Sequence, residues 1–313
     1  MYLDGVRRRY LRWVPISLTF SPLDQDGEPR VFGSAAGSII VAVLTASDGA
    51  ITTYTSAFDP TLASVTLTVG TYLAMDIFVV DWYQSDGTTQ THVGQREFEI
   101  VERFYFTSTD LRTREASTSD TSRDALATLL DVRAEIETQF EDRCGRSFVP
   151  RFRVLRKPIS PALGWATPGE VYAAPIRVVL DRAPVRAVRW IKIFDPLDVL
   201  AYTLTSTEVA AIQPSDSGVI NLPWIIPAGS ILVGFEHGQS APPADLKRAA
   251  MTAAKYGLNG SRTGIDARAT SMTTAEGAHM TLATPGVRDW ITGIPGVDEV
   301  VNAYAGLHGG GIG

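Results

Sequence analysis

The segment from Thr121 to Phe152 constrains the fold most, because it joins an amphipathic helix to a strand through an abrupt turn. Its large apolar residues recur at spacings of three, four and multiples of these, so they share one stripe of a helix over 121–144. The stripe consists of Leu126, Leu129, Leu130, Ile136, Phe140 and Cys144. Residues Thr121 to Asp124 are similar to a capping box, and Gly145 can supply the left-handed residue that ends the helix. A helix with one apolar side must bury it, so we expect a packed domain around this segment.

The residues before this helix are predicted to form an all-β domain over 1–106. Alternating or apolar runs such as 38–44 and 72–83 are typical of strands, and Asp-Gly and Asp-Pro pairs separate them. Six or seven short strands with such punctuation favour an immunoglobulin-like sandwich. Residues 107–120 are polar and hold no apolar pattern, so we expect a linker or the approach to the helix there.

The residues after the linker are predicted to form a second domain and an arm. We expect a domain over 121–257 that contains the amphipathic helix, a β region and a second helix over 243–257, which has a face of small residues. The remainder, 258–313, is rich in Gly, Thr, Ala and Ser, which indicates an extended C-terminal arm with one short helix at 295–305. The predicted fold class is therefore α+β.

Composition limits the partners of the chain. Its 313 residues carry a formal net charge of −6, and no segment forms a basic domain, which argues against tight binding to nucleic-acid phosphates. No run approaches 18 apolar residues, so no membrane-spanning segment is expected. Cys144 is the only cysteine and lies on the apolar helix stripe, so we interpret it as a buried core residue without a disulfide partner.

No combination of residues predicts a catalytic, cofactor-binding or metal site. The four histidines are scattered without the spacing of metal ligands, and the motifs of nucleophile elbows, P-loops and dinucleotide-binding units are absent. We therefore expect a protein that is not an enzyme and needs no cofactor. An enzyme of unrecognised type remains an alternative, which converging titratable groups in a cleft would favour.

Two charged clusters are candidate contact sites. Acidic and arginine side chains alternate on the flank of the first helix, and this flank is either a solvated face or an interface between copies. The candidate interface residues are Asp131, Arg133, Glu137 and Arg143. A basic cluster follows the helix, and it either keeps a strand edge soluble or lines a channel or contacts a partner. Its candidate residues are Arg151, Arg153 and Arg156.

Four pieces of the sequence together resemble a known family. The run 124–151 resembles the first helix of the head-tail connector, or head-completion adaptor, of long-tailed double-stranded DNA bacteriophages. In that family the helix ends in an aromatic residue followed by a Cys-Gly-Arg-Ser-Phe type of turn, which is Phe140 and Cys144 to Phe148 here. Three later pieces are similar to the family in the same order, and they lie at 180–188, 233–250 and 293–302. The resemblance covers about residues 107–305, and the N-terminal sandwich is an addition to the minimal family member.

The resemblance implies a structural virion protein made in the host cytoplasm and located in the neck. It implies a ring of twelve copies between the portal protein and a head-tail stopper or tail-completion protein. Double-stranded DNA would pass through the ring without sequence-specific contacts, and the sandwich would contact capsid or tail parts. The apolar side of the C-terminal helix is expected to contact the portal or a neighbouring subunit. Its residues are Val297, Val300, Val301 and Tyr304.

One further alternative is a carbohydrate-binding or adhesion module fused to an α+β domain. Aromatic side chains such as Trp82 and Tyr83 stack on sugars in proteins of that kind. The competing interpretation is that both residues belong to the core of a central strand. Their exposure in the folded protein distinguishes the two interpretations.

Overall fold

The computed structural model describes most of the chain and has the α+β composition that the sequence predicts. The described residues are 7–20, 39–57, 65–85, 88–114, 126–159, 176–215, 217–222, 229–260, 271–273, 279–281 and 292–306. The chain divides into two compact units. The helical unit comprises Met1–Arg8, Arg103–Pro150 and Gly238–Gly313, and the β unit comprises Arg9–Glu102 and Arg151–His237.

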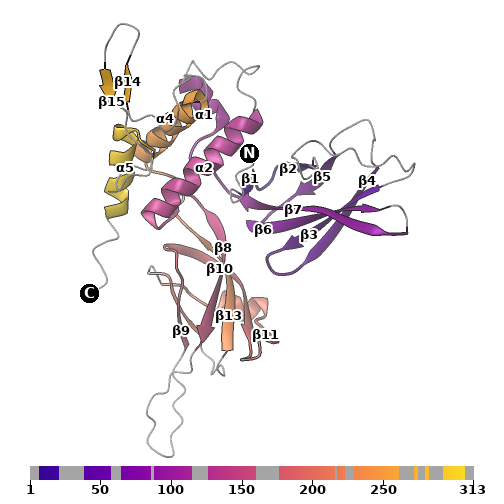
Figure 1. The fold of residues 1–313 in the computed structure, drawn as a ribbon. Coiled ribbons are helices and arrows are strands. Elements are labelled where there is room, and N and C mark those ends of the chain that lie inside the picture. The colour runs from indigo at the N-terminus through magenta and orange to yellow at the C-terminus, as the bar shows by residue number, and fades with distance from the viewer. Residues whose placement is uncertain are drawn as a thin grey trace, which may run out of the picture. The chain divides into compact units, whose positions relative to one another are not determined.

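The helical unit is built from four helices that pack on one another (Figure 1). They are α1 (Ser108–Arg114), α2 (Leu126–Cys144), α4 (Ala244–Gly260) and α5 (Pro295–Gly306). Helix α2 contacts both α4 and α5, and α4 and α5 also contact each other. A two-stranded hairpin, β14 (Ser271–Thr273) with β15 (His279–Thr281), lies between α4 and α5 in the chain.

One apolar core holds the helical unit together. Its buried members come from the segment before α1 and from all four helices, together with the turn after α2. Among them are Phe106, Leu111, Phe140, Phe148, Leu246, Ala250, Val297 and Val301. Four alanines on α4, Ala249, Ala250, Ala253 and Ala254, are almost fully buried, because small side chains allow the helices to approach closely. The small-residue face predicted for the second helix is therefore a packing face.

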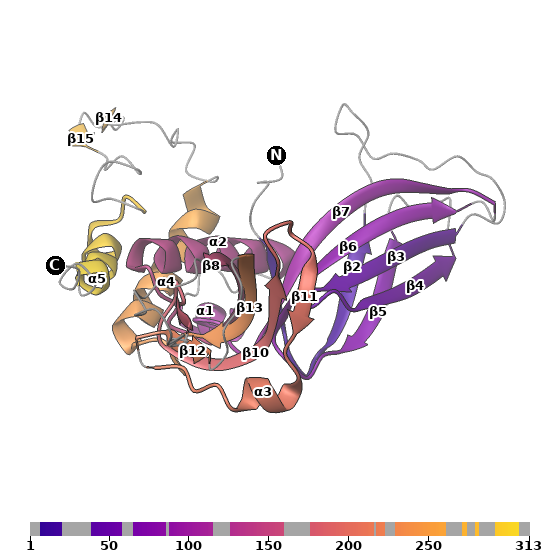
Figure 2. The ribbon, with the colours of Figure 1, turned by 90° about the horizontal axis from the view of Figure 1, so that it is seen from below.

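The N-terminal part of the β unit consists of two sheets that share a core (Figure 2). The larger sheet has the order β1 (Arg8–Leu11), β7 (Gln90–Val101), β6 (Asp76–Ser85), β3 (Ile39–Ala46) and β4 (Ile51–Ala57). The smaller sheet pairs β2 (Pro15–Phe20) with β5 (Val65–Thr71). Alternate residues such as Ile40, Ala42 and Leu44 point into the common core, as strand periodicity requires. The immunoglobulin-like topology stays a prediction.

The second part of the β unit also has two sheets around one core. A four-stranded antiparallel sheet runs in the order β11 (Leu200–Thr203), β10 (Val185–Phe194), β13 (Gly229–His237) and β8 (Arg151–Ile159). A two-stranded sheet pairs β9 (Ile176–Val179) with β12 (Val219–Leu222), and the short helix α3 (Ser206–Ala210) follows β11. Isoleucines and valines of β9, β10, β12 and β13 fill the space between the sheets. Strand β11 and strand β8 thus form the two edges of the larger sheet.

The boundaries of the two units do not coincide with those of the domains predicted from the sequence. The predicted domain 121–257 contributes its helices to one unit and its β region to the other. The predicted linker contains α1, whose Leu111 is buried in the helical core. Thr107 caps this helix: its hydroxyl accepts from the amide of Asp110, and the Asp110 carboxylate accepts from the amide of Thr107. A helix of two turns with one buried apolar residue gives no periodic signal, which is why the sequence pattern missed it.

Candidate functional site

The apolar stripe of α2 is buried as predicted over most of its length. Ile136, Phe140 and Cys144 lie in the helical core, and the ring of Phe140 meets the ring of Tyr105 edge-on at 6.4 Å. The first residue of the helix differs, because Leu126 is 52% exposed. The backbone of Gly145 has a φ of +64°, as expected for the left-handed residue that ends a helix. The capping box predicted at 121–124 lies outside the described residues.

The charged flank of α2 divides into two buried and two exposed residues. Glu137 has no exposed surface, and its carboxylate accepts a hydrogen bond of 2.8 Å from the amide of Tyr105. Arg133 is also buried; its guanidinium group lies 3.3 Å from the centre of the Phe104 ring and donates to the Phe106 carbonyl. Both side chains therefore hold the aromatic segment 104–106 against α2, since buried backbone groups need hydrogen-bond partners.

This burial changes the candidate subunit interface. Arg133 and Glu137 face their own unit and offer no surface to a neighbouring copy. Asp131 and Arg143 remain exposed. Asp131 lies 3.5 Å from Arg8, and Arg143 donates two hydrogen bonds to the side-chain oxygen of Asn302 in α5. A role of Asp131 and Arg143 between copies stays a prediction.

Helix α5 packs its apolar side on α2 and α4 of the same chain. Val297 and Val301 are almost fully buried, and Val300 and Tyr304 are partly buried against the same core. The Tyr304 hydroxyl donates to the carboxylate of Asp245 in α4, and its ring meets Phe148 edge-on at 5.3 Å. Burial, together with this carboxylate, raises the pKa of Tyr304. In the single chain, the four residues predicted to contact the portal or a neighbour thus serve internal packing.

Cys144 belongs to this helical packing. Its thiol is buried and donates weakly to the Val301 carbonyl over 3.6 Å. Burial raises the pKa of the thiol to about 11, so it stays protonated and unreactive near neutral pH. The interpretation of Cys144 as a core residue at the end of the helix fits this environment.

The basic cluster on β8 is largely neutralised within the chain. Arg151 is buried, and Arg153 forms a two-pronged ion pair with Asp181 at 3.0 and 2.5 Å. Arg156 pairs with Asp198, donates to the Ser230 hydroxyl and lies over the ring of Phe194. These three arginines therefore form no uncompensated positive surface.

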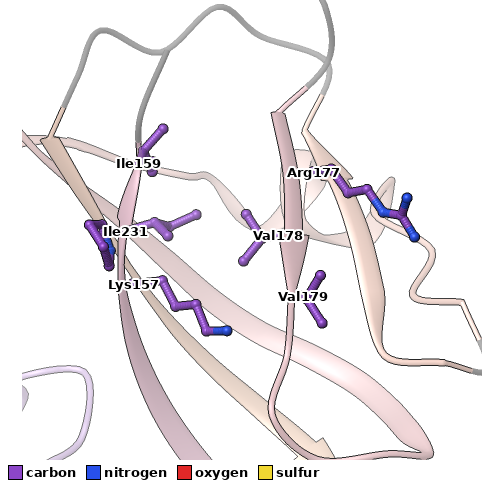
Figure 3. Close-up of a pocket in the computed structure, with 7 residues that line it drawn as sticks. Lys157, Ile159, Arg177, Val178, Val179 and Ile231 are labelled. Carbon is purple, nitrogen blue, oxygen red and sulfur yellow. The ribbon is translucent and has the colours of Figure 1, made fainter. Parts of the chain in front are cut away.

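A hollow of about 230 Å³ lies beside this cluster, between β8, β9 and β13 (Figure 3). Its buried apolar residues are Ile159, Val178 and Ile231, and the exposed Pro158 and Val179 also line it. The cationic side chain of Lys157 also lines it, and Arg177 contributes to the lining from β9. In Figure 3, Val178 points toward Ile231, whereas Arg177 and Val179 point to the other side of β9. The hollow thus has an apolar floor and one cationic side chain, Lys157, at its rim, which the sequence did not indicate.

The aromatic pair proposed for sugar stacking is not presented at the surface. Trp82 is 1% exposed and belongs to the core of the N-terminal sandwich. Tyr83 is partly buried, and its ring lies 5.2 Å from that of His92. Trp82 therefore cannot stack on a sugar, and its burial supports the interpretation as a core residue.

The titratable groups of the described residues form no metal site. No group of three or more His, Cys, Asp or Glu side chains there is placed to hold a metal ion. His237 is buried at the end of β13, where burial and three nearby arginines lower its pKa to about 3, so it stays neutral. None of the described helices combines the length and the hydropathy that crossing a membrane requires.

Comparisons with known proteins give limited matches. No protein-family model and no curated protein matches the chain. Among solved structures, a chain of the neck of an empty GTA particle, computed with C6 symmetry, matches with 19% identity and a TM-score of 0.30. That match covers 45% of this chain and 75% of the other. A chain of the neck of a native GTA particle, computed with C12 symmetry, matches with 16% identity and a TM-score of 0.32, over 56% of this chain and 88% of the other. At such TM-scores the likeness carries no argument about the role of this chain.

Proposed function

We propose that this chain is a structural protein of the neck of a tailed, phage-like particle. It acts as a head-to-tail adaptor that forms a dodecameric ring below the portal protein and extends the DNA channel toward the next neck or tail protein. The chain has no catalytic role in this proposal. The ring is the unit of function, and each copy contributes a contact surface rather than an active site.

One observation carries the proposal: three of the four sequence pieces that resemble the adaptor family meet in one core. Phe140, Cys144 and Phe148 come from the first piece, Leu246 and Ala250 from the third, and Val297 and Val301 from the last. These pieces are separated by long stretches of chain, yet their apolar residues pack together. A resemblance whose motifs assemble one folded unit is stronger support than four separate matches, because each motif is then explained by its contact with the others.

The electrostatics agree with a channel that conducts DNA without holding it. Arg153 and Arg156 are paired with Asp181 and Asp198 inside the chain. The formal net charge of the whole chain is −6. A protein that neutralised many phosphates would bind DNA strongly and in a salt-dependent way. Weak, non-specific contact suits DNA that must move through the ring.

The decisive experiment is an electron cryo-microscopy reconstruction of the particle that contains this chain. We expect the chain in a ring of twelve copies directly below the portal, with the sandwich directed to capsid or tail parts. Two point variants link the fold to this role. Val301→Asp places a charge in the helical core, so heads and tails should accumulate separately, whereas Ala303→Asp on the exposed side of α5 should assemble normally. Assembled particles that lack the chain, or carry it away from the neck, would contradict the proposal.

A further inference from the structure

The turn between β10 and β11, with the strand that follows it, presents an unusual apolar surface. Leu197 is 84% exposed, Val199 59%, Leu200 50% and Tyr202 46%. Single exposed apolar side chains are common on soluble proteins and need no explanation. Four large ones within six residues form a local cluster, and such clusters mark interaction sites.

The turn is held in a defined shape, so this surface is preformed. The carboxylate of Asp195 accepts hydrogen bonds of 2.9 Å from the amides of Leu197 and Val199. The amide of Asp195 in turn donates to the Val199 carbonyl, and Asp198 adopts a φ of +65° and pairs with Arg156. A fixed turn loses little conformational entropy on binding, which favours its use as an anchor.

Strand β11 adds an open edge to this surface. Among the described residues it pairs with β10 alone, and all four of its residues are exposed. An exposed edge with apolar side chains is a template for association unless something covers it. We therefore expect a partner to cover the turn and the edge of β11.

The opposite edge of the same sheet offers a complementary surface. Strand β8 lies at that edge, and the hollow between β8, β9 and β13 opens beside it. The floor of the hollow consists of Ile159, Val178 and Ile231. At about 230 Å³ it exceeds the cavities of about 150 Å³ that accept a benzene ring. An aliphatic side chain such as that of Leu197 is small enough to enter it.

The charges of the two surfaces are opposite. The segment from Asp195 to Ser215 carries three acidic side chains, Asp195, Asp198 and Glu208, and no basic one, and Asp198 already pairs with Arg156 of its own chain. Strands β8 and β9 carry only basic charges. Within the described residues, Lys157 on the hollow has no ion-pair partner, whereas the arginines of β8 are buried or paired. Opposite potentials favour correct alignment of two such surfaces.

We propose that the β10–β11 turn of one copy docks into the β8–β9 hollow of the next copy. The contact joins two different surfaces of the same protein, so it is head-to-tail, and repetition with the right rotation closes a ring. Leu197 fills the apolar floor, and Lys157 faces the acidic turn. This inference rests on the proposed ring and names the surfaces that build it.

Disulfide trapping tests the contact directly. We would place cysteines at Leu197, which is exposed in the single chain, and at Lys157, which lines the hollow, and assemble particles in cells from this double variant. The only native cysteine, Cys144, is buried, so background cross-linking is low. Mild oxidation should give a ladder of covalent multimers on a non-reducing gel. The matched pair with cysteines at Leu197 and Ile51, an exposed residue of the sandwich, should give none.

A second variant covers the case in which the double variant does not fold. Leu197→Asp should melt like the natural chain, because residue 197 is exposed, but should weaken association between copies about 10- to 100-fold, the range expected when a leucine no longer becomes buried. Particles whose rings contain the double variant but give no ladder, or rings that form normally with Leu197→Asp, would overturn the docking and leave the proposed function intact. Absence of the natural chain from the neck would instead contradict the proposed function.

Discussion

Truncation of Val301 to alanine tests whether α5 belongs to the core of its own chain. Val301 has no exposed surface, and its carbonyl accepts the weak hydrogen bond from the Cys144 thiol. The neighbouring Asn302 accepts two hydrogen bonds from Arg143. Helix α5 thus covers the end of α2, and weaker docking of α5 should expose Cys144 more often.

The size of the effect follows from the buried atoms. The substitution removes two methyl groups, each worth about 0.8 kcal/mol on burial, and leaves a small cavity that adds to the cost. Alanine has a higher helix propensity than valine, which offsets a few tenths of a kcal/mol of this loss. We expect the free energy of opening to fall by about 2 kcal/mol.

Thiol labelling measures this opening, because Cys144 is the only cysteine. Its burial and its pKa of about 11 prevent reaction in the closed state. When closing is fast relative to labelling, a loss of about 2 kcal/mol raises the labelling rate about 30-fold, at 1.36 kcal/mol per factor of ten. The control Val14→Ala removes the same atoms from a side chain that is 48% exposed, and it should leave the rate unchanged. An unchanged rate for Val301→Ala would refute the docking of α5 on its own α2.

Two further predictions concern stability. The pKa of His237 is about 3 in the folded chain and near 6.5 in the unfolded chain. The contribution of neutral His237 to the free energy of unfolding is therefore complete above pH 6.5 and declines below it, because the unfolded chain then binds a proton that the folded chain does not. The free energy of unfolding should fall by about 2 kcal/mol between pH 7 and pH 5. Denaturant titrations should show this loss in the natural chain and in His92→Gln but not in His237→Gln, and an equal loss in all three would contradict it. Gly145→Ala should cost about 1–2 kcal/mol, since its φ is positive but its surroundings are open. Gly238→Ala should cost clearly more in the same titration, because its Cβ would lie 2.2 Å from the Val149 carbonyl oxygen, and equal costs would rule out the clash.

Local patterns predicted much of the helical unit. The three-and-four spacing of Ile136, Phe140 and Cys144 is a property of one helix, so it could be read without knowing the neighbours. Gly145 after the helix and the small residues of α4 are equally local signals. The short C-terminal helix was also predicted, at 295–305, and the structure has it at Pro295–Gly306.

The roles of the charged residues could not be predicted in this way. Arg133 and Glu137 lie on a helix with many acidic and basic side chains, and a helix pattern assigns such residues to solvent. They are buried because the aromatic segment 104–106 folds back onto α2 and brings backbone groups that need partners. Arg153 and Arg156 formed a basic cluster in the sequence, but Asp181 and Asp198, which neutralise them, come from other parts of the sheet.

Both halves of the candidate docking contact, the turn and the hollow, depend on the tertiary structure. The exposure of Leu197 and Val199 depends on the turn that Asp195 holds, and the hollow exists only where β8, β9 and β13 meet. The sequence by itself determined α2, α4 and α5 and the turn that ends α2, because these depend on residues a few positions apart, whereas the short helix α1 left no local pattern. The tertiary structure alone decided which charges are buried and which edges remain open, because both depend on contacts between segments distant in the chain.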